Sequence, residues 1–221
     1  MKKLLCSALI IMAAAFQAVA GSADAVREEW RQTWRSLGVD PAVAESVVWP
    51  EMQRYSPMRD VVETAADYGF YVLGEDSPDY SIGIFQMRPS FVEDLEKAWM
   101  GSGLAEEFNL AFDTADTAAA RHMRINRMNS SDWQVVYVGV FLRMLYHCYG
   151  LDALSAEDHV RLAATAYNRG CAWTDAGRGS VERLRRNSNV KSFSLAGPGR
   201  TPSQKYCYAT LAWEHYQSIT E

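Results

Sequence analysis

The stretch SDWQVVYVGVFLRMLYHCY, from Ser131 to Tyr149, decides the fold class. Apolar side chains occupy most of its helical surface and leave only a narrow polar stripe of Gln134, Arg143 and His147. A helix of this kind is buried, and its charges and length favour a core helix over a membrane span, which needs ~20 apolar residues. The sequence therefore predicts a mainly α protein built around this helix.

Further helical segments are predicted on both sides of this central one. Capping residues, helix-starting prolines and stopping glycines indicate their bounds. We expect helices over Asp24 to about Gly38, Asp40 to Pro50, Pro57 to about Leu73, Pro89 to about Met100, Asp113 to about Met128, Ser155 to about Gly170, Val181 to Arg186 and Ser203 to Ile219. Pro50 is expected to interrupt its helix, because proline lacks the amide hydrogen that a helix interior uses.

The first 20 residues, 1–20, have the pattern of a secretory signal peptide. Two lysines precede an apolar run from Leu4 to Ala15, and small residues precede Gly21. We therefore expect an exported, periplasmic protein in which residues 21–221 form a single domain. We expect no stable membrane insertion after the signal is removed.

The charge of the chain argues against nucleic acid as a partner. The chain has 22 Lys+Arg and 27 Asp+Glu, and loss of the two signal lysines changes the net charge from −5 to −7. A negative chain without a basic run lacks the electrostatic footprint of a nucleic-acid-binding protein.

The cysteines and histidines show no metal-binding pattern. Outside the signal segment, Cys148, Cys171 and Cys207 permit one disulfide with one thiol left over, and their spacing does not show which two pair. The cysteines are widely spaced, and the histidines lie on separate predicted helices: His122, His147, His159 and His215. We expect no metal and no cofactor.

Two short motifs suggest the halves of a sugar-binding cleft. In YSIGIFQM, Tyr80 to Met87, Gly83 lets backbone amides approach a ligand, and Gln86 can both donate to and accept from an acetamido group. In AATAYNRG, Ala163 to Gly170, an aromatic and an amide stand at a helix end where glycine reverses the chain. Each motif alone also fits a buried turn or an ordinary helix end.

Together the motifs resemble those of the lysozyme-like lytic transglycosylases, and YSIGIFQM also resembles the corresponding loop of goose-type lysozymes. The resemblance covers roughly Val43 to Trp173. It implies a lysozyme-like helical domain with a short irregular or β segment lining the cleft. It also implies that the chain cleaves peptidoglycan glycan strands between N-acetylmuramic acid and N-acetylglucosamine.

The same resemblance implies roles for individual residues. Glu51, at the end of the apolar run Val47-Val48-Trp49-Pro50, corresponds to the catalytic acid, with Ser81 and Gln86 binding substrate opposite Tyr167 and Asn168. An apolar wall of Trp49, Phe85 or Met87 would raise the pKa of this acid. The family reaction is an internal attack by the sugar's own C6 hydroxyl, which leaves a 1,6-anhydromuramic acid end.

Two departures from the family pattern leave alternatives open. Met52 replaces the usual Ser, and the long interval from Glu51 to Gln86 makes Glu63 a rival acid. Helical phasing argues against Glu63, because it turns Val61, Val62, Ala65, Ala66 and Gly69 inward and leaves Glu63 beside Arg59 at the edge.

Other functions also fit the chain. Asp76 or Asp79 would make the protein a hydrolytic muramidase if either activated water, although this segment also fits a solvated turn. If the acid is not functional, the protein is a catalytically silent peptidoglycan-binding module. If the two motifs match by chance, the protein is a helical adaptor. No protein partner is indicated.

Overall fold

The computed structural model of the chain describes residues 23–74, 79–173, 181–195 and 204–221. Within these ranges the chain is mainly helical, as predicted, and the predicted signal peptide and Asp76 lie outside them. The helices are α2 (Ala23–Ser36), α3 (Pro41–Arg54), α4 (Pro57–Tyr71), α5 (Pro89–Gly101), α6 (Leu104–Glu107), α7 (Ala118–Met128), α8 (Ser131–Tyr149), the 3-10 turn η1 (Leu151–Ala153), α9 (Ala156–Arg169), α10 (Val181–Asn187) and α11 (Tyr208–Thr220). The strands are β1 (Lys191–Phe193) and β2 (Tyr206–Cys207).

The central helix α8 is buried along most of its length, which confirms its predicted place in the core. It packs against α2 and α5, and the indole Nε1 of Trp34 donates to the carbonyl oxygen of Val135 at 2.9 Å. Gln134, expected on a polar stripe, is also buried. None of the helices within the described ranges combines the length and apolar character that a bilayer span requires.

The helix α3 runs through Pro50, so the predicted interruption is wrong. Proline removes one helical hydrogen bond, and continued helix then depends on tertiary support. Here α3 packs against both α9 and α11, and the Tyr208 hydroxyl donates to the Val47 carbonyl oxygen at 2.9 Å. The prediction failed because this support comes from the far end of the sequence.

Three other elements differ from prediction. The helix α7 begins at Ala118 instead of Asp113, because Thr117 caps it by accepting from the amide of Ala120 at 3.2 Å. The last helix begins at Tyr208 instead of Ser203. The residues before it form β2, which pairs antiparallel with β1, an arrangement that the local pattern did not show.

The helix α4 does not have the predicted phase. Val61 and Val62, expected to face inward, are 69% and 67% exposed.

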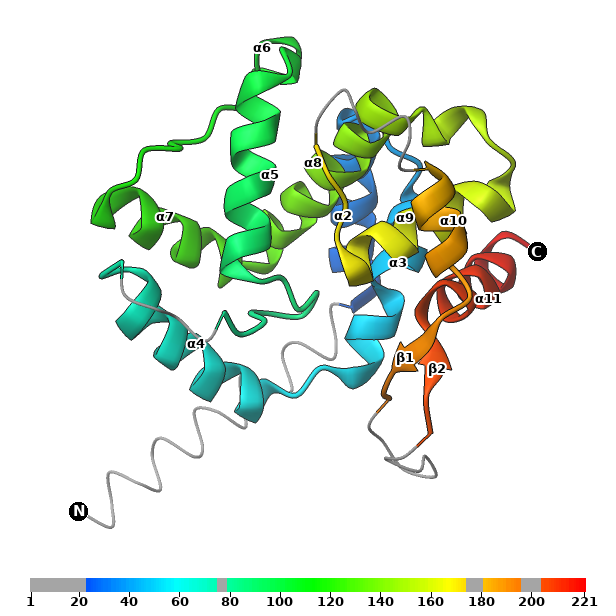
Figure 1. Cartoon of the computed structure of the whole chain (residues 1–221), viewed down its shortest axis with the longest axis horizontal. Helices are drawn as coiled ribbons and strands as arrows, with labels where there is room; N and C mark the ends of the chain where they lie inside the picture. The colour runs from blue at the N-terminus through cyan, green and yellow to red at the C-terminus, as the bar shows by residue number, and fades with distance from the viewer. Residues whose placement is uncertain (1–22, 75–78, 174–180, 196–203) are drawn as a thin grey trace.

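In Figure 1, α4, α5 and α7 lie at one side of the molecule, whereas α10, α11 and the β pair lie at the other. Between these groups, the ends of α3 and α9 approach the irregular segment 79–88.

Candidate functional site

A pocket of about 370 Å³ lies between α3, the start of α5, the end of α9 and the irregular segment. All five residues predicted to form the site line it: Glu51, Ser81, Gln86, Tyr167 and Asn168. Its volume falls in the usual range for ligand pockets, about 300–1,000 Å³. The two sequence motifs and the proposed acid therefore share one cavity, although their chemical roles remain predictions.

Glu51 enters this pocket from the last turn of α3 and is 5% exposed. Burial raises the pKa of its carboxyl group from 4.5 to about 7, and the charges of Arg54 and Arg88 limit that rise. Burial has this effect because a low-dielectric environment disfavours the ionised carboxylate. At neutral pH a large fraction of the Glu51 side chains is therefore protonated.

Arg54 is the nearest positive charge to Glu51. Its Nε lies 2.9 Å from Glu51 Oε2, which is an ion-pair distance, but neither atom has a well-aligned hydrogen-bond partner within the described chain. The Arg54 guanidinium also lies over the ring of Phe193 in β1, at 5.1 Å. The contact lowers the pKa of Glu51 without cancelling the effect of burial.

The segment containing Ser81 and Gln86 is a tight loop closed by an isolated bridge. Ile82 and Met87 exchange backbone hydrogen bonds of 2.7 and 3.1 Å, and the Gln86 side chain donates to the Gly83 carbonyl oxygen at 2.9 Å. Gln86 itself has φ 54°, in the left-handed region that non-glycine residues seldom occupy. Such strain persists only where surrounding contacts enforce it, and functional sites often contain it.

The side chain of Gln134 in α8 hydrogen-bonds to the backbone of this loop, a role that the sequence did not predict. Its Oε1 accepts from the amide of Phe85 at 2.9 Å, and its Nε2 donates to the carbonyl oxygens of Met128 and Ile82. A Cβ on Gly83 would lie 1.3 Å from Gln134 Nε2. Glycine at this position therefore makes room for Gln134, and the approach of a ligand to this backbone stays a prediction.

One signal in the sequence pointed to Gln134: it is the one amide side chain of a mostly apolar helix. A buried amide requires hydrogen-bond partners, and loop backbone supplies them. The loop is also held from α4, because Asp60 Oδ1 accepts from the amide of Gly83 at 2.6 Å.

Tyr167 joins the two motifs directly. Its hydroxyl donates to the carbonyl oxygen of Phe85 at 2.8 Å, and its ring packs edge-on against Phe91 and Phe141. Burial, with a smaller contribution from the charge of Glu51, raises the pKa of Tyr167 well above 10. Tyr167 thus fixes the loop and stays protonated, while Asn168 lies beside it in the pocket lining.

The pocket also contains charged residues that were not predicted. Arg54, Arg88 and Arg169 line it with one further carboxylate, that of Asp94. Arg88 directly follows the first motif and Arg169 belongs to the second, so their positions were visible in the sequence. Asp94 shares a face of α5 with Ser90 and Phe91, which a helical wheel beginning at Pro89 would have shown.

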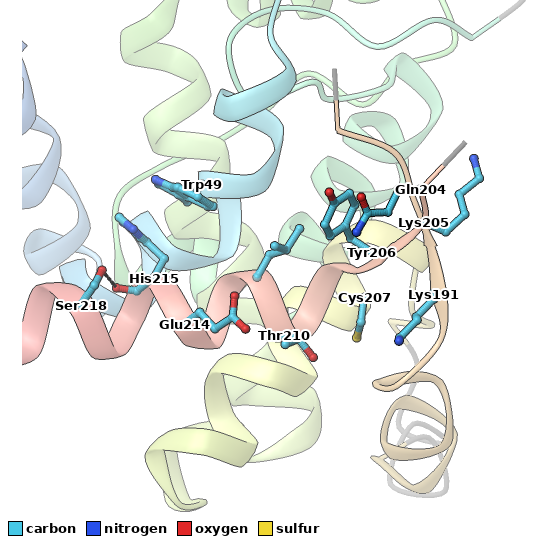
Figure 2. Close-up of a pocket in the computed structure, with 11 residues that line it drawn as sticks. Trp49, Lys191, Gln204, Lys205, Tyr206, Cys207, Thr210, Glu214, His215 and Ser218 are labelled. Carbon is cyan, nitrogen blue, oxygen red and sulfur yellow. Dashed lines mark hydrogen bonds between the residues drawn. The ribbon is translucent and has the colours of Figure 1, made fainter. Parts of the chain in front are cut away.

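Several other predicted residues lie outside the pocket. Trp49 lines a separate hollow of about 510 Å³, where it stacks on His215 with ring centres 4.8 Å apart (Figure 2). It therefore does not form the predicted wall beside Glu51, and Phe85 is buried in the core against Trp30. Only Met87 of the three predicted wall residues lines the pocket.

The rival carboxylates are also placed elsewhere. Glu63 lines a different surface hollow with Met58 and Tyr80. Asp79 accepts from the amide and hydroxyl of Ser90 at 2.9 and 2.7 Å, so its carboxylate anchors the start of α5.

Comparisons with protein-family models, curated proteins and solved structures found no match to the chain. Among the described residues no group of three or more His, Cys, Asp or Glu side chains is arranged to hold a metal ion.

Proposed function

We propose that the protein is a periplasmic lytic transglycosylase with a lysozyme-like fold that cleaves peptidoglycan glycan strands. The observation that carries the proposal is the buried carboxyl of Glu51, with a pKa of about 7, in the pocket that both motifs line. Cleavage of a glycosidic bond near neutral pH needs a carboxyl group that is still protonated there. Glu51 meets that requirement by position and by environment.

In the proposed reaction, Glu51 acts first as an acid and then as a base. Its proton moves to the oxygen that bridges the two sugars, and the bond from that oxygen to C1 of N-acetylmuramic acid breaks. The C6 oxygen of the same sugar bonds to C1, and its proton passes to the Glu51 carboxylate, which restores the acid. This internal attack gains from the high effective concentration of a hydroxyl on the same ring.

The charges of the pocket agree with an acidic substrate. Arg54, Arg88 and Arg169 give a positive cavity to a chain whose overall charge is negative. The muramic acid lactyl group and the peptide attached to it present carbonyl oxygens and carboxylates, which arginine binds well. We therefore assign the muramic acid side of the strand to this cluster.

Asp94 supports a second candidate function, hydrolysis by a muramidase. A retaining or inverting hydrolase needs a second carboxylate near the acid, and Asp94 lines the same pocket as Glu51. The two reactions differ in their products, because an anhydro end is lighter than a reducing end by one water.

The test is mass spectrometry of fragments released from purified peptidoglycan by the wild-type protein and three variants. We expect anhydro ends from the wild type, a rate at least about 100-fold lower for Glu51→Gln, and near wild-type rates for Asp94→Asn and Glu63→Gln. The last variant is the matched control, because it makes the same substitution at the rival glutamate outside the pocket.

Each alternative has its own outcome in this experiment. Reducing muramic ends, lost in Asp94→Asn, would establish the muramidase. Binding to peptidoglycan without any release, equal in the wild type and Glu51→Gln, would establish a silent binding module. An unchanged rate for Glu51→Gln would contradict the assignment of the acid.

A further inference from the structure

The three described cysteines occupy two different parts of the fold. Cys207, at the end of β2, is buried and its thiol donates to the carbonyl oxygen of Ser188 at 2.9 Å. Cys148 lies in the last turn of α8, and Cys171 follows the end of α9. Both Cys148 and Cys171 are half-buried thiols in the structure.

Contacts beside Cys148 and Cys171 bring their two segments together, and the two thiols interact electrostatically. The Cys148 thiol lies 3.9 Å from the carbonyl oxygen of Trp173. The hydroxyl of Tyr149 donates to the carbonyl oxygen of Ala172 and accepts from the amide of Ala172 at 3.1 Å. The chain from Cys171 to Trp173 is therefore fastened along the C-terminal turn of α8.

We propose that Cys148 and Cys171 form a disulfide in the mature protein, and that Cys207 stays a thiol. The proposal rests on the export included in the proposed function, because an oxidising compartment is where such a bond forms and persists. The bond would join the end of α8 to a residue that lines the candidate pocket.

The chemistry needs an external disulfide as the oxidant. The thiolate of one cysteine attacks a sulfur of the oxidant and expels one of its thiols. The second cysteine then attacks the mixed disulfide, forms the Cys148–Cys171 bond and expels the other thiol. The two cysteines lose two protons and two electrons, and the oxidant becomes two thiols.

The surroundings of Cys171 favour the oxidised form once it is made. Burial and the nearby Cys148 raise the pKa of the Cys171 thiol to about 12. A thiol whose thiolate is disfavoured is a poor leaving group, so a reductant expels Cys171 from the disulfide slowly. The bond also closes a loop of 22 intervening residues, which restricts the unfolded chain.

To test the proposal, the full chain is exported to a bacterial periplasm, and its peptides are mapped by mass spectrometry under non-reducing conditions that keep disulfides intact. We expect a Cys148–Cys171 linked peptide, an intact mass lower by two hydrogen atoms, and one thiol open to alkylation after unfolding. The control Cys207→Ser keeps the linked peptide, whereas Cys148→Ser and Cys171→Ser lose it.

Thermal unfolding gives a second measurement. Reduction should lower the Tm of Cys207→Ser by about 5–10 °C and leave a variant that also carries Cys148→Ser unchanged. Three alkylatable thiols, a linked peptide containing Cys207, or a cross-link between two chains would each overturn the proposal. None of these readouts uses glycan cleavage, so failure of the disulfide is distinguishable from failure of the proposed activity.

Discussion

Glu51 combines burial with an ion-pair partner, and the balance of the two sets its protonation. Desolvation disfavours its charged form, while Arg54 and Arg88 favour it. The hydroxyls of Tyr167 and Tyr208 do not donate hydrogen bonds to the Glu51 carboxylate, because they donate to the carbonyl oxygens of Phe85 and Val47. The acid is therefore tuned mainly by its apolar surroundings and by the arginines.

The raised pKa makes a prediction about stability. Because the folded-state pKa exceeds the unfolded value of 4.5, the stabilisation that Glu51 gains by protonation is complete below pH 4.5 and is lost as pH rises through about 7. Relative to wild type, Glu51→Gln should become more stable by about 2–3 kcal/mol between pH 4.5 and pH 8. Urea unfolding at the two pH values measures this difference, and a difference independent of pH would contradict the shifted pKa.

Substitution of Arg54 should change the pH dependence of activity. Arg54→Gln removes a charge that lowers the pKa of Glu51, so the pKa rises further. Because the reaction starts from the protonated acid, the alkaline limb of the pH–rate profile should move upward by about one unit.

Arg169→Gln is the control for this charge change. It removes a positive charge from the same pocket, but Arg169 is not among the groups that act on the pKa of Glu51. A limb that moves equally in both variants would show that the general charge of the pocket, and not the Arg54 contact, controls the acid.

At the scale of elements, the loop that lines the pocket depends on α8 behind it. Gly83 has φ 75°, and Gln134 occupies the space that a side chain there would need. Gly83→Ala therefore meets both a strained backbone and a steric clash, with an expected cost of about 2–4 kcal/mol. Denaturant unfolding measures that cost.

Gly69 provides the matched control in α4. It is exposed, and apart from its chain neighbours and its own helix backbone no atom of the described residues lies within 4 Å of a Cβ placed there. Gly69→Ala should stabilise the protein by about 0.5–1 kcal/mol, because alanine restricts the unfolded chain and favours helix. Equal effects at the two glycines would show that Gln134 does not confine the loop.

Elements specified by nearby residues were predictable, and those that depend on distant contacts were not. Ser155, where a helix was expected to begin, caps α9 by accepting from the amide of Asp158 at 3.2 Å. Around Pro50, by contrast, α3 packs against α11 and accepts a hydrogen bond from Tyr208, more than 150 residues away in sequence. The exposure of Val61 and Val62 likewise depends on which face of α4 has neighbours, which a helical wheel does not specify.

In the candidate site too, residues within the motifs could be predicted, and residues that depend on distant contacts could not. The motifs and the family resemblance pointed to five residues that line the pocket, because the glycine and amide positions are recognisable in the motifs and the resemblance supplies the acid, Glu51. They did not identify Gln134, which lies 48 residues after Gln86, or assign a role to Asp94. Trp49 adjoins the Pro50-Glu51 pair in sequence but points into another hollow, because residues two apart on a helix face different directions (Figure 2).

At the scale of the whole molecule, a buried charge network joins four helices. Glu96 of α5 is fully buried and accepts from Arg124 and Arg127 of α7 and from the Tyr137 hydroxyl of α8. Arg124 also contacts the hydroxyl of Tyr71, at the end of α4. Ion pairs thus join α5 to α7, Arg124 connects them to Tyr71 of α4, and the hydrogen bond of the Tyr137 hydroxyl connects this side of the molecule to the central helix α8 (Figure 1).

The network predicts a large difference between two similar substitutions. Glu96→Gln removes the anion that lies 2.7 Å from Arg124, whose side chain is 1% exposed, and should cost about 3 kcal/mol because a buried cation loses its main partner. Glu107→Gln removes the partner of Arg143 at the surface, 3.5 Å away, and should change stability by less than about 0.5 kcal/mol. Urea unfolding of both variants measures the contrast. Similar costs would mean that the described network adds no more to stability than an exposed pair, and that apolar packing alone holds α4, α5 and α7 to the core.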